Sequence, residues 1–503
     1  MKIKLRAIAH SRSGDKGNRS NISVIPFDVA HYPHLCRVLT AEAVKKHFES
    51  IVAGEVVRYE MPEISALNFV MDNALGGGIT RSLSLDAHGK SFGSAMLEIE
   101  IEAPAGWLPP VDAIDDRCRP AEHLPKAEDF LLWPPNVQAY GYRIVDKLFN
   151  SRVIDKASVP APLVYGNRLE IEYEAGGSRY GIPGFMDRNA ISGLLVIKDG
   201  AVVVERYGLG LQPHDRWSTM STVKSITATL VGVAVNDGAI ASLDDKVTNY
   251  VPALAGSAYQ DVSIRNLLTM SSGIEWNEDY ADKQSHVNRY SKSLADGVPG
   301  GVLALLRELP RIHAPGKHWH YNTGDTFLLG AALRSAVGMP LAQYMSSRIW
   351  GPCGMEFDAF YTLESPDGLE IGGSRAGIAL RDFGRFARFV LDEGRVDAAS
   401  LLPQGWNDEA AAMSFVFDDK HRSESPDIVS GSLSGYGYSW WIAEDGAMVA
   451  AGFAGQRIYI NRKERLAIVT LGAFPEPRYR GPGDHDRRAE VVQFTESVKK
   501  ALS

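Results

Sequence analysis

Apolar runs and turn residues predict sheet strands at both ends of the longer, C-terminal part of the chain. Residues 193–205 hold two apolar runs separated by Asp-Gly, the pair that best suits a tight β-hairpin. A second hairpin is predicted where 457–460 and 466–471 flank a polar turn, and a final helix is predicted over 487–502. The region between the two predicted hairpins has mostly the residue spacing of helices. The pattern therefore favours an α+β fold, with an antiparallel sheet from both chain ends and a helical insertion.

The first hundred residues have the pattern of a separate, smaller α+β unit. Strands are predicted over residues 4–9, 21–27, 55–59, 82–85 and 95–101. Helical spacing over 40–52 places Ala41, Val44, Phe48 and Ile51 on one side, with Thr40 as N-cap. The stretch 11–18 is rich in turn formers and is expected to be a turn.

Proline marks the boundary between these two patterns. Seven prolines and several acidic residues crowd the stretch 103–135, a composition that suits an extended linker. A length of 503 residues is also too great for one ordinary core. We therefore predict a first domain over 1–104, a proline-rich linker over 105–135 and a second domain over 136–503.

Composition excludes several partners. A formal net charge of −8 leaves no basic footprint for nucleic acid. The chain contains no run of about 18 apolar residues that would cross a membrane, and its first residues lack the apolar stretch of a secretory signal. Three widely separated cysteines fit reduced thiols. The expected location is cytoplasmic.

A Ser-x-x-Lys motif supplies the candidate chemistry. It occurs three times, at Ser13–Lys16, Ser221–Lys224 and Ser497–Lys500. Only Ser221 begins a predicted helix that is apolar over most of its length, so its backbone N–H would lie among the unpaired helix N-terminal donors and could bind an oxyanion. Lys224, three residues on, would lie over the same face, and burial would favour its neutral amine. On spacing alone, a capping serine beside a solvated lysine is the favoured interpretation, because short motifs often match by chance.

Five ordered blocks after Ser221 provide that context. They are residues 263–274, 321–330, 352–355, 436–441 and 452–456. Together with Trp217 to Lys224, they resemble the serine β-lactamase-like family over about residues 135–503, in particular class C β-lactamase relatives and 6-aminohexanoate-oligomer hydrolases. This resemblance implies a β-lactamase/transpeptidase-like domain and an acyl-serine mechanism.

The resemblance also implies roles for individual residues. Ser221 would be the nucleophile, and Lys224 and Tyr321 would handle its proton, with Tyr321 as general base. Adjacent His320 is the competing base. The backbone N–H groups of Ser221 and Phe453 would form the oxyanion hole. Thr323, Gly452 and Gln456 would line the substrate pocket.

Two departures from the family pattern bear on the substrate. Thr323 stands where many relatives have the asparagine of Tyr-x-Asn, and Ala450-Ala451-Gly452 stands where many have Lys-Thr-Gly or His-Thr-Gly. The cation that would meet a substrate carboxylate is absent from that motif. We therefore expect a neutral ester or amide as small-molecule substrate, rather than a carboxylate-bearing β-lactam.

The first domain has its own resemblance. Residues 9–18, Leu39 to Glu42, Arg58 to Glu60, Leu67 to Phe69 and Ala74 to Gly78 look like the AtuA ferredoxin-like domain, over about residues 3–104. That likeness implies a fold and no reaction. The loop at Asp15 and Lys16 could bind a ligand or form a tight turn with an internal ion pair. The domain is also a candidate surface for homo-oligomer contacts.

Three functions remain open at this point. The first is a serine esterase or amidase. The second is a non-catalytic ligand-binding or sensor protein on the same fold, and the third is a true β-lactamase or D-alanyl peptidase. His313, His318 and His320 lie close in sequence but lack a His-Glu-x-x-His pattern, so neither a metal nor another cofactor is expected.

Overall fold

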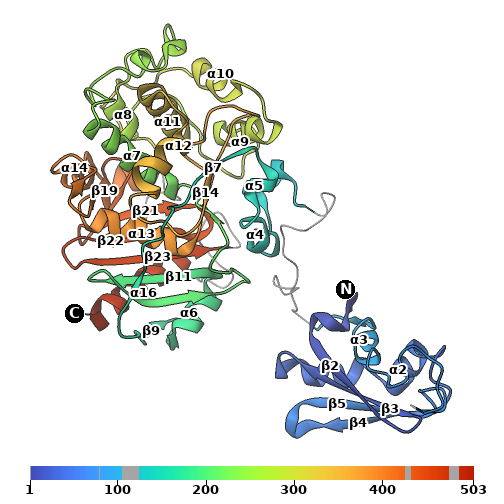
Figure 1. Ribbon diagram of the computed structural model, residues 1–503. Coiled ribbons are helices and arrows are strands. Elements are labelled where there is room, and N and C mark those ends of the chain that lie inside the picture. Colours follow the sequence, from blue (N-terminus) through green and yellow to red (C-terminus); the bar gives the residue numbers. More distant parts are fainter. Residues whose placement is uncertain (1, 79, 105–123, 425–431, 475–485, 503) are drawn as a thin grey trace. The chain divides into compact units, whose positions relative to one another are not determined.

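A computed structural model describes residues 2–78, 80–104, 124–424, 432–474 and 486–502 (Figure 1). The chain divides into two compact units, Met1–Pro110 and Val111–Ser503, each with its own apolar core. Most of the predicted linker, residues 105–123, lies outside the described residues. None of the helices in the described ranges is both long and apolar enough to cross a bilayer.

Unit 1 is built on a four-stranded antiparallel sheet in the order β2-β3-β5-β4. Its strands and helices are β1 (Lys2–Lys4), β2 (Ala9–Lys16), β3 (Arg19–Pro26), α1 (Tyr32–Val38), α2 (Ala41–His47), β4 (Val56–Met61), β5 (Ala66–Met71), α3 (Phe92–Met96) and β6 (Glu100–Glu102). β1 pairs with β6 in a separate two-stranded sheet. The predicted helix begins as expected, because the Thr40 hydroxyl accepts a hydrogen bond from the Ala43 N–H at 3.1 Å.

Other predictions in unit 1 were wrong. The stretch 11–18, predicted as a turn, is mostly strand β2, because pairing with β3 from Ala9 to Lys16 overrides the turn preference of its residues. Residues 82–85 are not a strand; Leu83 and Leu85 are fully exposed and pair with no neighbour. The predicted strand 95–101 divides between α3 and β6. Ile51, placed on the buried helix face, is 50% exposed because α2 ends at His47.

Unit 2 contains a nine-stranded sheet made from both ends of the unit, as predicted. Its strands, in spatial order, are β18 (Phe415–Val416), β19 (Leu433–Tyr436), β20 (Trp441–Ala443), β21 (Met448–Gly452), β22 (Gln456–Asn461), β23 (Leu466–Gly472), β11 (Ile191–Lys198), β12 (Ala201–Tyr207) and β8 (Val164–Tyr165). Asp199 and Gly200 take φ angles of 50° and 84° between β11 and β12, which confirms the hairpin. The final helix, α16 (Arg487–Leu502), has the predicted bounds.

The helices of residues 264–337, which come between the two groups of sheet strands in the sequence, gather above the large sheet in the view of Figure 1. The helices of unit 2 before α16 are α4 (Pro135–Gly141), α5 (Val145–Leu148), α6 (Ile182–Arg188), α7 (Thr222–Asn236), α8 (Ile264–Leu268), α9 (His286–Asp296), α10 (Gly301–Glu308), α11 (Thr323–Val337), α12 (Leu341–Met345), α13 (Leu380–Leu391), α14 (Trp406–Ala411) and α15 (Asp419–Glu424). The smaller sheets are formed by β13 (Trp217–Ser218), β15 (Ala376–Ile378), β14 (Ala359–Thr362) and β7 (Ser151–Ile154), by β9 (Glu172–Ala175) with β10 (Ser178–Gly181), and by β16 (Arg395–Val396) with β17 (Ala399–Ser400).

The core of unit 2 includes residues from the segment predicted as linker. Phe130 and Trp133 are 0% and 4% exposed, and both rings contact Tyr142. The guanidinium of Arg375 lies 4.6 Å from the Phe130 ring centroid. The hydrophobic core of unit 2 therefore includes residues that precede the predicted boundary at residue 136.

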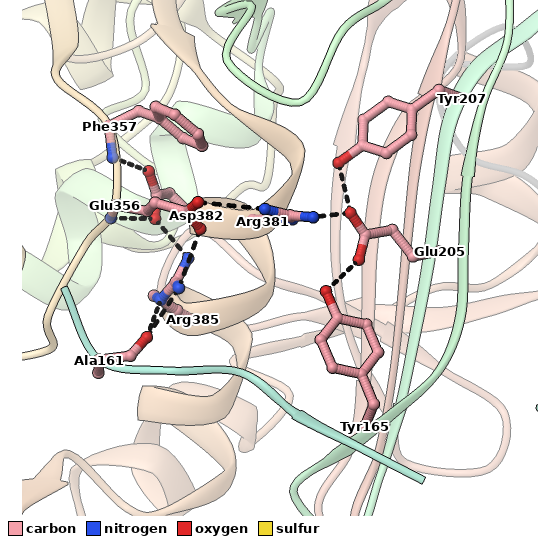
Figure 2. Close-up of polar contacts among 9 residues, drawn as sticks. All are labelled: Ala161, Tyr165, Glu205, Tyr207, Glu356, Phe357, Arg381, Asp382 and Arg385. Carbon is pink, nitrogen blue, oxygen red and sulfur yellow. Dashed lines mark hydrogen bonds and ion pairs between the residues drawn. The ribbon is translucent and has the colours of Figure 1, made fainter. Parts of the chain in front are cut away.

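A buried carboxylate fixes the start of α13 (Figure 2). Asp382 is 1% exposed and accepts hydrogen bonds from the backbone N–H groups of Glu356 and Phe357, at 2.8 and 2.9 Å. It also accepts one from Arg385 Nη1 at 3.0 Å. One side chain thus joins α13 to the turn before β14.

Arg381 on the same helix makes the complementary link to the large sheet. Figure 2 shows its guanidinium directed at Glu205 of β12, with Nε 2.7 Å from Oε1. Tyr165 and Tyr207 donate to the same carboxylate, each at 2.6 Å. Sheet, helix and turn are therefore joined by one continuous polar network.

We expect Asp382→Ala to lower the free energy of unfolding of unit 2 by about 2–5 kcal/mol, because it leaves the backbone N–H groups of Glu356 and Phe357 without an acceptor and takes from Arg385 one of its two carboxylate partners. Urea unfolding followed by tryptophan fluorescence measures this, since eight of the nine tryptophans belong to unit 2. Asp296→Ala is the matched control: its ion pair with Lys292 is 67% and 45% exposed, so it should cost less than about 1 kcal/mol. Equal losses in the two variants would contradict this account.

Candidate active site

Ser221 lies at the N-terminus of α7, directly after a strained turn. Strand β13 pairs with β15 and ends at Ser218, and the chain then turns into the helix through Met220, whose φ is 46°. Positive φ is costly for a residue with a Cβ and persists only where the surrounding structure imposes it. The turn places Ser221 at the N-cap position, lining a cavity beside the end of β21.

Lys224 is the only lysine among the described residues that is almost completely buried, at 2% exposed. Its Nζ lies 3.1 Å from Ser221 Oγ and 3.2 Å from Thr323 Oγ1, and it donates to the carbonyl oxygen of Gly373. Burial lowers the pKa of Lys224 to about 8, and the negative charge of Glu278 opposes that shift. About half of the amine is therefore neutral at pH 8, far more than for an ordinary lysine.

The ammonium form of Lys224 can donate to all three oxygens, and the neutral amine can also satisfy the three contacts. A neutral amine has two N–H donors and one lone pair. Its two N–H groups can donate to the Gly373 carbonyl oxygen and to the Thr323 hydroxyl oxygen. Its lone pair can then accept a hydrogen bond from the Ser221 hydroxyl. The same geometry can therefore draw the proton from Ser221.

Tyr321 closes the other side of the site. It is 5% exposed and stacks on Trp441 with ring centroids 5.6 Å apart. Lys224 Nζ lies 5.3 Å from the Tyr321 ring centroid, and Tyr321 lines the same cavity as Ser221. Serine, lysine and tyrosine are thus brought together from α7 and from the segment that leads into α11.

The cavity at Ser221 has mostly apolar walls. They are formed chiefly by Tyr280, Trp441, Val449, Ala451, Phe453, Phe474 and Val491. Gly452 comes close to the nucleophile segment: a Cβ on it would lie 3.0 Å from both the Met220 Cβ and the Thr219 carbonyl oxygen. A glycine therefore allows β21 to approach the serine turn this closely.

Gln456 lines the cavity, but its amide is engaged within the protein. It donates to the carbonyl oxygens of Phe453, Ala454 and Gly472 and accepts from Trp217 Nε1 and the Gly472 N–H, five bonds in all. These bonds hold the turn Phe453–Gly455, in which Ala454 has a φ of 58°. Gln456 therefore fixes the backbone of the candidate oxyanion residue Phe453.

The other sequence candidates lie elsewhere. Ser13 belongs to unit 1, where its hydroxyl donates to the Lys90 carbonyl oxygen at 3.0 Å, and Ser497 is on α16. The Nε2 of His320 lies 2.7 Å from the Trp276 carbonyl oxygen, and His320 is not among the described residues lining either cavity at Ser221. In the described ranges no group of three or more His, Cys, Asp or Glu residues is disposed to hold a metal.

The sequence prediction missed four residues at this site. Glu278 and Tyr280 line a second cavity at Ser221, and Arg457 and Arg488 line the first. The alternation from Trp276 to Tyr280 could have indicated the first pair, because Trp276 and Glu278 are buried while Asn277 and Asp279 are exposed. Arg457 faces Ala451 only through the pairing of β21 with β22, which no local pattern shows.

A helix that starts with Ser-x-x-Lys and packs against an antiparallel sheet from both chain ends defines the β-lactamase/transpeptidase class of fold. Residues 173–493 match the model of the Beta-lactamase family, and the chain belongs to that family. Residues 3–102 match the AtuA ferredoxin-like domain, so unit 1 is a ferredoxin-like domain. Both resemblances seen in the sequence are confirmed.

Known proteins agree with this assignment. The 6-aminohexanoate-dimer hydrolase of Paenarthrobacter ureafaciens is 28% identical over 302 residues, which cover 58% of this chain and 75% of the relative. A solved structure titled "Putative 6-aminohexanoate-dimer hydrolase from Bacillus anthracis" superposes with a TM-score of 0.64 at 20% identity, covering 76% of this chain and 98% of that one. The second likeness concerns the fold alone.

Proposed function

We propose that this protein is a serine hydrolase that cleaves an ester or amide through an acyl-Ser221 intermediate. The observation that carries the proposal is the 3.1 Å contact between Ser221 Oγ and the buried Lys224 amine, at the wall of an apolar cavity. A nucleophile within hydrogen-bond reach of a base with a lowered pKa is the arrangement that activates serine. Membership in a family of β-lactamase-fold hydrolases supports the same reaction class.

Acylation begins when Ser221 Oγ attacks the substrate carbonyl carbon and its proton passes to Lys224 Nζ, which lies 3.1 Å away and here takes the general-base role that the family resemblance gave to Tyr321. The electron pair of the carbonyl π bond moves to oxygen, and the backbone N–H groups of Ser221 and Phe453 stabilise that oxyanion. The tetrahedral intermediate collapses with cleavage of the bond to the leaving group, which takes the proton through the Tyr321 hydroxyl. Water then attacks the acyl-serine, and the same groups carry its proton back to Ser221.

The strand beside the nucleophile favours a neutral substrate. Ala450 and Ala451 stand where a cation would meet a substrate carboxylate, and Ala450 is fully buried. Arg457 and Arg488 also line the cavity, from β22 and α16, and Arg457 Nη1 donates to Thr495 Oγ1 at 3.1 Å. The preference for a neutral substrate therefore rests on the missing cation of β21 and not on a cavity without positive charge. The relative that bears the name of an amide hydrolase supports including amides among the substrates.

The buried lysine also argues against a purely ligand-binding role. Burying an ionisable amine costs free energy, and its charge does not increase the affinity for a neutral ligand. A proton-transfer role explains why Lys224 is held against Ser221 in this way.

We expect wild type to hydrolyse neutral p-nitrophenyl esters and anilides of apolar acids, and Ser221→Ala to have no activity above background. Intact mass after a fluorophosphonate probe should show one adduct on wild type and none on the variant. Benzylpenicillin should acylate Ser221 at least about tenfold more slowly than a neutral ester, since no charge-assisted bond from that strand meets its carboxylate. An adduct on Ser221→Ala, or one mapped to Ser13, would refute the assignment.

Tyr321→Phe removes one hydroxyl and should leave packing on Trp441 intact. We expect a loss of about 10²–10⁴-fold in kcat, typical of a positioned proton-transfer group. Lys224→Met should lose at least as much, and the double variant should lose little more, because the two groups act as one unit. Near-wild-type turnover in Tyr321→Phe combined with collapse in His320→Ala would transfer the role to the histidine.

We also propose that unit 1 takes no part in the chemical step. A chain beginning at Val111 keeps Phe130, Trp133 and the whole core around them, so it should fold and hydrolyse the same ester at close to the wild-type rate. Size-exclusion chromatography of both forms would also show whether unit 1 mediates oligomer formation. A folded but inert truncated protein would show that unit 1 completes the site.

A further inference from the structure

Glu278 is a buried carboxylate that the mechanism above leaves without a role. It is 9% exposed and lies in the segment between α8 and α9. Its oxygens accept from Thr323 Oγ1 at 2.5 Å, from the Thr323 N–H at 3.3 Å, from the Tyr280 hydroxyl at 3.0 Å and from Trp276 Nε1. Such a set of donors holds one carboxylate in a fixed position next to the candidate active site.

Thr323 links this carboxylate to the lysine. Its hydroxyl has one hydrogen, and an ionised carboxylate can only accept, so that hydrogen is directed at Glu278. The Thr323 oxygen can then serve Lys224 Nζ, 3.2 Å away, only as an acceptor. One lysine N–H is thereby assigned to Thr323 and another to Gly373, and the lone pair remains for Ser221.

We propose that Glu278 is a positioning residue that orients the Lys224 amine through the Thr323 hydroxyl; this rests on the proposed serine-hydrolase function. Thr323 stands where many relatives have the asparagine of Tyr-x-Asn. An amide can donate and accept without help, whereas a hydroxyl needs a second group to set its direction. Glu278 supplies that direction, so the pair Thr323 and Glu278 replaces the single asparagine.

Glu278 also acts on Lys224 through its charge, which favours the ammonium and so opposes the effect of burial. The other titratable groups near the lysine and Glu278 are Tyr321, Tyr280, Tyr290 and Arg375. Arg375 donates to Ser291 Oγ, and the Tyr290 hydroxyl bonds with Ser374 Oγ. Asp325, on the same helix as Thr323, is paired with the Tyr259 hydroxyl at 3.0 Å. The negative charge linked to the lysine is therefore that of Glu278.

The test is Glu278→Gln, assayed for kcat, KM and the pH dependence of kcat/KM on a neutral ester. Loss of orientation should lower kcat by roughly 10- to 100-fold with KM little changed. Loss of the negative charge should lower the lysine pKa, so the midpoint of the rising acidic limb should move down by about one pH unit. Damage to packing alone would reduce activity without moving that midpoint. Glu275→Gln, which changes an exposed glutamate on the same segment, is the matched control and should leave both quantities unchanged.

Two variants of Thr323 test the same link with Glu278 in place. Thr323→Val removes the hydroxyl and should reproduce the kcat loss of Glu278→Gln, whereas Thr323→Ser keeps the hydroxyl and should lose at least about tenfold less. This pair of variants also tests the link if Glu278→Gln fails to fold. Wild-type kcat and midpoint in Glu278→Gln, or equal activity in the valine and serine variants, would overturn the proposal. If wild type itself neither reacts with a fluorophosphonate probe at Ser221 nor turns over esters, the serine-hydrolase proposal fails instead.

Discussion

The organisation of the candidate site depends on one constraint, the burial of the Lys224 amine. An amine removed from water loses hydration that only precise hydrogen bonds replace, and its charged form is disfavoured. Lys224 satisfies the constraint with Ser221 on its own helix, Thr323 at the start of α11 and the carbonyl oxygen of Gly373. Three separate segments must therefore meet at one atom.

The surrounding fold brings those segments together. The loop that carries Gly373 packs so tightly on α11 that a Cβ there would lie 2.9 Å from the Thr326 Cβ, so glycine allows its carbonyl to reach the lysine. The serine turn needs a left-handed Met220 on one side and the glycine of β21 on the other. The Asp382 network holds α13 against the large sheet on which α7 also packs.

The strongest local signals were sufficient to predict much of unit 2. The Asp199-Gly200 hairpin, the final helix and the position of Ser221 at a helix start all depend on residues within a few positions of one another. The predictions failed where tertiary pairing decides the outcome: β2 forms through residues that prefer turns because β3 supplies its partners. Glu278 was missed for the same reason, since its role depends on Thr323, 45 residues away in the chain. Arg457 lines the cavity because the register of β21 and β22 pairs it with Ala451, and this register cannot be inferred from neighbouring residues in the sequence.

The ionisation of Lys224 underlies the proposed mechanism and can be observed directly. Wild-type protein with ¹³C-labelled lysine side chains can be titrated by NMR, and the Lys224 signal is identified by its loss in Lys224→Met. The account predicts a midpoint at about pH 8, well below the 10.5 of an ordinary lysine. A midpoint at or above 10.5 would mean that almost none of the amine is neutral near pH 7 to 8, and it would contradict a role for Lys224 as the base that activates Ser221.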